Sequence, residues 1–270
     1  TLGNSQSFGE VNVARRGVKS CSSEIRGLTA GGYDGSYTDE IDYFTIASSG
    51  NFQDFGDLTS SQFQLGSFSS STRGVFGGGE PFTNVISYVE ISTIGNALDF
   101  GDLSVSRNYV ATHSSPVRGV FAGGLSGWGT PAGWEETIEH VTISSKGNGT
   151  QFGNLTAFRH AIGSCSNSIR GLFFGGSRSP LTVTIMDYIP ISTGGNSVEF
   201  GNLSSTRSDT EAVATSTRAV CCGGYSSSNV NIMEYVTIST LGDAIDFGDL
   251  IKPIHQQGAC SDSHGGLGGF

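Results

Sequence analysis

The chain has 270 residues, of which 36% are hydrophobic and only 14% are charged, with 41 glycines and 17 phenylalanines. A formal net charge of −10 argues against nucleic-acid and anionic-membrane partners, because both require a cationic surface. No run of 18 apolar residues occurs, so we expect no membrane insertion. Abundant glycine and serine with regularly spaced aromatic residues is typical of all-β repeat folds.

The first element along the chain is the tetrapeptide Phe8-Gly9-Glu10-Val11, which belongs to a repeat. Successive copies are separated by 47, 45, 52, 48 and 47 residues. A repeat of this length indicates stacked supersecondary units. The later copies begin at Phe55, Phe100, Phe152, Phe200 and Phe247.

Three further elements recur in phase with this tetrapeptide. One runs from Arg26 through apolar residues to a glycine pair, and the next is a β-branched and aromatic run such as Ile41 to Ala47. A Gly-Asn turn follows, and a short segment such as Tyr109 to Ser115 comes after the tetrapeptide. Four strand candidates in each of about six units predict a six-bladed β-propeller of four-stranded antiparallel blades.

We expect one propeller domain over residues 1–270, with the glycine-pair strand innermost and the repeated phenylalanine between blades. The sixth blade is split: 264–270 supply its inner strand and 1–23 its third and outer strands, without a second strand. We further expect a longer parent polypeptide whose preceding residues supply that strand. The five complete blades are predicted at 26–70, 73–115, 118–167, 170–216 and 218–263.

The chain shows no constellation for catalysis or cofactor binding. The five cysteines lack Cys-x-x-Cys spacing, and we interpret them as small buried thiols within strands. The histidines lie in different blades or strands, without helical metal spacing. We therefore predict no enzyme activity, no metal and no cofactor.

Two series of arginines recur with the repeat. The first comprises Arg26, Arg73, Arg118, Arg170 and Arg218, and the second comprises Arg15 or Arg16, Arg107, Arg159 and Arg207. If the first series faced the axis, it would hold an anion. We favour structural pairing within the blades, because residues that repeat serve the repeat.

Function is expected where the copies differ. The most variable segments follow the glycine pairs, and we expect all of these loops on one face of the ring. Exposed aromatic residues on loops of a rigid scaffold are suited to binding sugars or proteins. The predicted binding residues are Tyr33, Tyr37, Phe82, Trp128, Trp134 and Tyr225, with the alternative that the two tryptophans only cover a blade edge.

The order of these elements resembles the kelch repeat, with Phe in Phe247-Gly248-Asp249-Leu250 where the standard repeat has Trp. Units such as Thr72 to Gly78 and Tyr235 to Ser239 are more similar to kelch-like repeat proteins of tailed bacteriophages. This resemblance implies a virion or tail-fibre protein that presents loops to a receptor or glycan on the host surface. The alternatives are an architectural protein that docks on other virion proteins, and a propeller enzyme that acts on polysaccharide.

Overall fold

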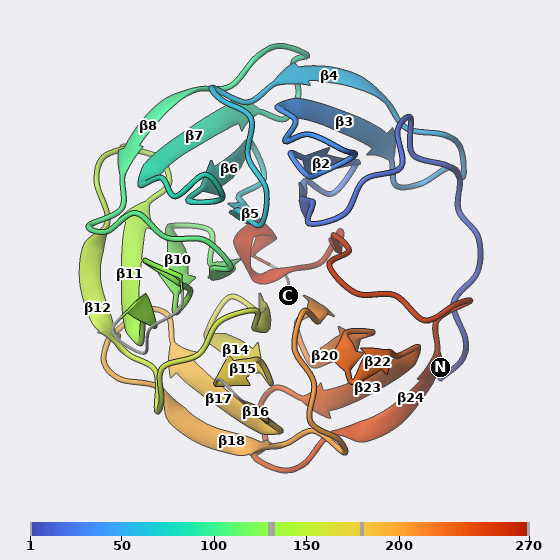
Figure 1. Cartoon of the computed structure of the whole chain (residues 1–270), viewed down its shortest axis with the longest axis vertical. Coiled ribbons are helices and arrows are strands. Elements are labelled where there is room, and N and C mark those ends of the chain that lie inside the picture. The colour runs from blue at the N-terminus through green and yellow to red at the C-terminus, as the bar shows by residue number, and fades with distance from the viewer. Residues whose placement is uncertain (1, 129–132, 179–180, 269–270) are drawn as a thin grey trace.

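The computed structural model describes residues 2–128, 133–178 and 181–268, and it is built almost entirely of β-strands. Five four-stranded antiparallel sheets stand around a common axis as the blades of a β-propeller (Figure 1). In the described ranges no helix is long and apolar enough to cross a membrane.

Each blade follows the chain from the axis to the rim. The first blade is β1 (Lys19–Ser22), β2 (Arg26–Ala30), β3 (Glu40–Thr45) and β4 (Gln53–Asp57). The second is β5 (Gly66–Ser69), β6 (Arg73–Gly77), β7 (Val85–Glu90) and β8 (Leu98–Asp102). The third is β9 (Ala111–Ser114), β10 (Arg118–Ala122), β11 (Thr137–Thr142) and β12 (Thr150–Asn154). The fourth is β13 (Gly163–Ser166), β14 (Arg170–Phe174), β17 (Ile185–Pro190) and β18 (Val198–Asn202). The fifth is β19 (Glu211–Ala214), β20 (Arg218–Cys222), β23 (Ile232–Thr237) and β24 (Ile245–Asp249).

Two hairpins rise from the loops after the glycine pairs of the fourth and fifth blades. They are β15 (Ser177–Arg178) with β16 (Leu181–Thr182), and β21 (Tyr225–Ser226) with β22 (Ser228–Asn229). Isolated bridges place the loops on one face, because a residue just before each inner strand pairs with the first residue after the glycine pair. The pair Arg16 and Tyr33 is an example. The expectation that these loops share one face is therefore confirmed.

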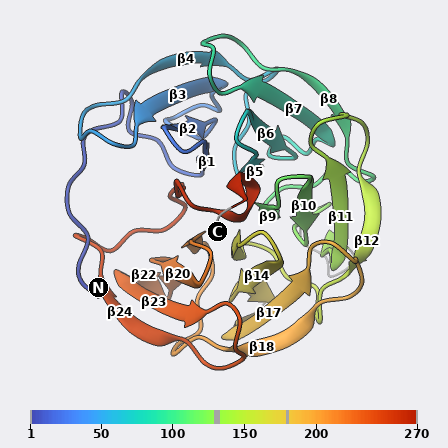
Figure 2. The same ribbon diagram turned by 180° about the vertical axis from the view of Figure 1, so that it is seen from behind.

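The innermost strand of each blade is the short strand that follows the Phe-Gly tetrapeptide of the preceding repeat, and not the strand that ends in a glycine pair (Figures 1 and 2). The prediction that the glycine pairs lie at the hub was therefore wrong. A repeat of four strands does not show in its sequence which of the four is the innermost strand of the blade, and this is why the order was misassigned. The blade predicted at 26–70 runs from Lys19 to Asp57. The blades predicted at 73–115, 118–167, 170–216 and 218–263 likewise run over 66–102, 111–154, 163–202 and 211–249.

The glycine pairs are turns at the end of the second strand. Gly31 and Gly32 have φ values of 65° and 117°, where a side chain is strained. A Cβ on Gly31 would also lie only 2.5 Å from the carbonyl oxygen of Gln62 in the next blade. The glycines are thus required by backbone conformation and close approach at the turn.

The repeated phenylalanine fills the wedge between neighbouring blades, as predicted. Phe55 is fully buried and packs with Leu28 of its own blade and Phe76 of the next. Four such apolar clusters join the five blades, one at each junction between consecutive blades. In the five blades the glycine after the phenylalanine adjoins a β-bulge, as at Gly56.

The second arginine series pairs within its own blade, as predicted, whereas most members of the first series bind a carbonyl of the next blade. In the first series, Arg73 donates to the carbonyl of Ile143 in the next blade at 2.8 Å and stacks on Tyr88. In the second series, Arg159 is fully buried and pairs with the equally buried Asp187. Arg107 with Glu139 and Arg207 with Glu234 repeat the second arrangement.

The sector between the fifth and first blades, here called the sixth sector, holds residues 2–17 and 250–268 and contains no sheet. The six-bladed prediction, including a sixth blade closed by strands from both termini, was therefore wrong for the described residues. The 264–268 segment forms the short 3₁₀ turn η2 (Gly265–Leu267) at the axis, and residues 19–22 belong to the first blade. Without a middle strand to pair with, segments at the rim and the axis cannot form a ladder.

Candidate functional site: the axial mouth and the loop face

The ring is closed around the axis on the loop face by backbone hydrogen bonds. In each sector one residue just before the inner strand donates its N–H to the carbonyl of the same position in the preceding sector. The six bonds measure 2.8 to 3.3 Å, and Gln256 supplies the position of the sixth sector. The members of this ring, which we call the axial mouth, are Gly17, Gln64, Tyr109, Ala161, Asp209 and Gln256.

Every residue of the axial mouth has a left-handed backbone conformation. Their φ values lie between 52° and 67°, a region that favours glycine. Gly17 uses it without strain, whereas the other residues carry side chains there at about 1 kcal/mol or more each. Strained positions of this kind cluster at ligand sites, so the polar side chains of Gln64, Tyr109, Asp209 and Gln256 mark a candidate site.

The polar side chains of the mouth contact one another. Gln256 donates to Asp209 at 3.2 Å and accepts from the exposed Arg16 at 3.3 Å. Burial, and next the charge of Asp209, raise the pKa of Tyr109 to about 12, so its hydroxyl remains a hydrogen-bond donor at neutral pH. The buried amide nitrogen of Gln64 has no partner among the described residues. The mouth therefore presents amide, phenol and carboxylate groups together.

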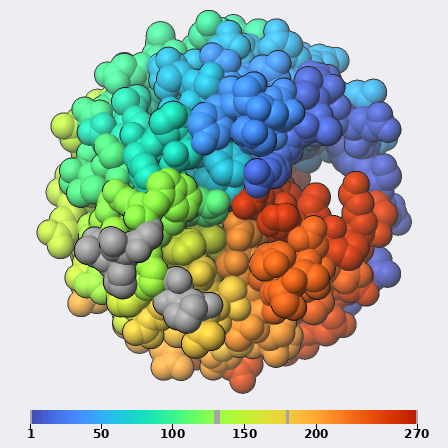
Figure 3. Space-filling model, viewed as in Figure 1, coloured from blue at the N-terminus to red at the C-terminus, as the bar shows by residue number. Residues whose placement is uncertain are grey.

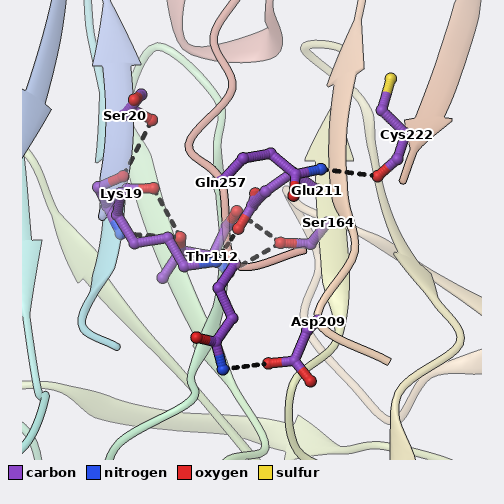
Figure 4. A network of polar contacts seen from close by, with 10 residues as sticks. Lys19, Ser20, Thr112, Ser164, Asp209, Glu211, Cys222 and Gln257 are labelled. Carbon is purple, nitrogen blue, oxygen red and sulfur yellow. Dashed lines mark hydrogen bonds and ion pairs between the residues drawn. The ribbon is translucent and has the colours of Figure 1, made fainter. Parts of the chain in front are cut away.

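Beneath the mouth lies an axial cavity of about 60 Å³. Hydroxyl groups line it, and each donates to a carbonyl of the inner strand of the preceding blade. Ser67 donates to Ser20 O at 3.0 Å, and Thr112 donates to Ser67 O at 2.6 Å. Ser164 continues the series to Thr112 O at 2.7 Å (Figure 4). The wall is thus polar, but its hydroxyls are engaged in holding the inner strands together.

One ion pair crosses the top of this cavity. Lys19 pairs with Glu211 from the opposite edge of the sixth sector (Figure 4). The corresponding positions in the other sectors are Gly66, Ala111, Gly163 and Gly258, so these two charges occur where the copies differ. Burial lowers the pKa of Lys19 to about 8, with the charge of Asp209 opposing. The pair links the first and fifth blades across the sector that lacks a sheet.

The far end of the cavity is closed by the C-terminal segment. The ring of His264 lies 2.8 Å from the carbonyl of Ser22 and 3.1 Å from the hydroxyl of Ser69. Gly265 and Gly266 of η2 pack against the backbone of the inner strands with no space for a Cβ.

Four of the six predicted binding residues come together on the loop face. Tyr33 and Tyr37 have ring centroids 5.8 Å apart, and Phe82 and Trp128 are 5.6 Å apart. Tyr109 of the mouth lies 6.2 Å from Trp128 and connects the two pairs through Phe63. Trp128 is 58% exposed, so one indole of this aromatic row faces solvent.

The other two predicted residues lie outside the aromatic row. Trp134 packs on Phe158 at 5.3 Å, as expected for a tryptophan that covers a blade, and Tyr225 is tilted against His255 at 5.8 Å. The loop that carries Trp128 and Trp134 also includes 129–132, which lie outside the described residues. Among the described residues no group of three or more metal-ligating side chains occurs.

Sequence reasoning missed Phe63 and the whole axial mouth. The signal was present, because the positions three and two residues before each inner strand differ among copies while their neighbours repeat. The first of these positions is Arg16, Phe63, Asn108, His160, Ser208 and His255 in chain order. These side chains surround the mouth and would have been found by comparing copies position by position.

The fold is a five-bladed β-propeller (Figure 1), and the site is a polar axial mouth bordered by loops that carry aromatic residues. No family model matches the chain, and no curated protein matches it either.

Proposed function

We propose that the protein is a non-enzymatic binding module that recognises a carbohydrate on its loop face. The observation that carries this proposal is the exposed indole of Trp128 beside the strained polar ring of the mouth. An aromatic face stacks on the apolar face of a sugar ring, while amides and carboxylates bind its hydroxyls. Tyr109 belongs to both parts, so one oligosaccharide would contact them together.

The carboxylates near the mouth support binding rather than hydrolysis. A glycosidase needs two carboxyl groups free to act on the same bond. Glu211 is paired with Lys19, and Asp209 accepts a hydrogen bond from Gln256. Both groups are thus engaged in holding the mouth and the ring together.

The resemblance of the repeat to kelch-like proteins of tailed bacteriophages suggests where such a module would act. We place it on the virion, as a tail-associated propeller that presents the loop face to a host-surface glycan or receptor. The module would meet other virion proteins through its blade edges. An architectural role without glycan recognition is the second candidate, and the open edge of the sixth sector favours it.

A glycan array tests the proposal with two matched variants. Trp128→Ala removes the exposed indole and is expected to weaken binding about 10-fold or more. Trp134→Ala, from the same loop but packed on Phe158, is the control and is expected to bind like the parent protein. Absence of glycan binding by the parent protein, or equal binding by the parent and Trp128→Ala, would contradict the proposal.

A further inference from the structure

The outer rim of the sixth sector repeats the contacts of the complete blades. In each complete blade the outer strand accepts two backbone hydrogen bonds from the turn of the next sector. Residues 3–10 supply both the donating turn and the accepting outer strand. Gly3 N donates to Phe247 O at 3.1 Å, and Phe8 O accepts from Gly50 N at 3.1 Å. The 8–10 segment therefore occupies the place of an outer strand, without the strand that should lie inside it.

The inner rim of this sector is also in register. The hydroxyl of Ser22 donates to the carbonyl of Ser261 at 2.8 Å, as Ser69 does to Ser22 and Ser114 does to Ser69. Residues 258–261 thus stand at an inner-strand position. What the sector lacks lies between rim and axis, and Figure 3 shows an opening there between the blue N-terminal and red C-terminal segments.

Some backbone groups in the walls of this opening have no hydrogen-bond partner among the described residues. The backbone groups of Ser7 and Gly9 alternate with the engaged Phe8 and Glu10, and they have no hydrogen-bond partner among the described residues. Alternation along a strand turns Ser7 and Gly9 toward the position of a third strand. This is the edge to which a further strand adds.

Apolar side chains in the walls are also more exposed than their counterparts in the complete blades. Phe8 is 37% exposed and Val11 46%, whereas their counterparts Phe55 and Leu58 are 0% and 6% exposed. In the first blade Tyr43 packs on Phe55 at 6.1 Å, whereas no tyrosine among the described residues packs on Phe8, whose ring lies 5.4 Å from that of Phe44.

The opposite wall of the opening carries a guanidinium group, that of Arg218. Arg26, Arg73, Arg118 and Arg170 each donate to the carbonyl of the isoleucine that follows the third strand of the next blade. The next sector after Arg218 has no such strand, and its guanidinium has only the ring of Tyr235 at 4.5 Å among the described residues. Arg218 is therefore a hydrogen-bond donor that lacks the acceptor carbonyl bound by the other four arginines.

We infer that the sixth sector binds an extended peptide strand of the type that forms the third strand of the five blades. By the register of β23 against β24, its first four residues lie opposite Glu10, Gly9, Ser7 and Gln6. Its fourth residue is a tyrosine over Phe8, and an isoleucine near its end offers its carbonyl to Arg218. The sequence Ile232–Ser239 has this form.

The third residue of the strand distinguishes this sector from the others. In four complete blades that position is acidic and pairs with an arginine whose side chain is buried, as Glu234 does with Arg207 and Asp42 does with Arg15. In the second blade Ser87 takes this position and Gln62 replaces the arginine. Ile254 takes the arginine's position in the sixth sector, so a buried acid there would be unpaired. The bound strand therefore carries a small neutral residue at this point.

Synthetic fluorescent octapeptides test the inference by anisotropy. One is Ile-Met-Ser-Tyr-Val-Thr-Ile-Ser, the second keeps the glutamate of Ile232–Ser239, and the third is a scrambled control. We expect the serine peptide to bind at least 10-fold more tightly than the other two. Arg218→Met is expected to weaken its binding about 10-fold, because a charge-assisted bond is lost. Arg170→Met, whose partner carbonyl is already present, is the matched control.

A fusion of the serine octapeptide directly ahead of Thr1 raises its effective concentration and tests the same contact when free peptide binds weakly. A higher melting temperature of this fusion, relative to one carrying the scrambled octapeptide, supports the inference. Equal melting temperatures together with no binding of the free peptide would overturn it, as would equal binding by Arg218→Met and the parent protein. Trp128 lies in the third blade, so failure here leaves glycan binding unchanged.

Discussion

The wedge between the first and second blades and the sixth sector are built from the same repeat, yet only the wedge has a core. Both have the rim contacts between outer strand and turn, and both have a link in the axial mouth. Only the wedge contains middle strands, and there Phe55 is fully buried while Phe8 in the sixth sector is 37% exposed. Backbone contacts at rim and axis thus close the ring, whereas apolar burial depends on the middle strands.

The largest expected difference between these regions is the effect of removing the repeated phenylalanine. Phe55→Ala should lower the free energy of unfolding by about 3–5 kcal/mol, because it leaves a cavity in a packed core. Phe8→Ala should lower it by about 1–2 kcal/mol, because this side chain is already partly in water. Urea unfolding of both variants measures the difference, and equal losses would show that the sixth sector is packed like the others.

Buried ion pairs sharpen the comparison among complete blades. Arg159→Met leaves the buried Asp187 without its cation and should cost about 3–5 kcal/mol. The double variant Arg159→Gln with Asp187→Ser introduces the neutral residues that the second blade has at these two positions, Gln62 and Ser87, so it should recover most of that loss. Unfolding free energies of the two variants decide the matter, and a double variant as unstable as the single one would contradict this view of the pair.

A smaller effect is expected where two closed wedges differ by one side chain. Phe68 packs over Gly119, whereas His113 packs over Gly171 with both ring nitrogens unpaired among the described residues. His113→Phe should therefore stabilise the protein by about 1–3 kcal/mol at pH 7.

The same residue predicts a pH dependence. Burial lowers the pKa of His113 from 6.5 to about 3, so the unfolded chain binds its proton at a higher pH than the folded protein does. The parent protein should lose stability as pH falls from about 6.5 toward 3, and His113→Phe should lose less over that range. Melting temperatures at pH 7 and pH 4 measure this, and an identical loss in both proteins would refute it.

Much of the architecture was predictable because the same pattern of strand and turn residues occurs in each copy of the repeat. The spacing of the phenylalanines predicted wedges, and Phe55, Phe100 and Phe200 are buried as expected. Strand order within the blade was not predictable, because a cyclic repeat has no marked beginning. Only contacts between neighbouring inner strands, such as Ser69 with Ser22, show which strand lies at the axis.

The candidate site was predictable only in part, for a different reason. Trp128 and Tyr37 were found because they are large aromatics on variable loops, and both are exposed. Tyr109 was missed because its role depends on a left-handed backbone that every sector shares. Its neighbours in space come from three sectors, so only a comparison of equivalent positions in the copies could have brought them together.

Amide hydrogen exchange measured by NMR tests the central claim most directly, because it reports on the axial mouth and the sixth sector in one experiment. The account predicts slow exchange for the amides of Gly17 and Gln256, which close the mouth, and fast exchange for those of Ser7 and Gly9. Fast exchange at Gly17 and Gln256, or protection of Ser7 and Gly9 in the isolated chain, would contradict a closed ring with an open sixth sector.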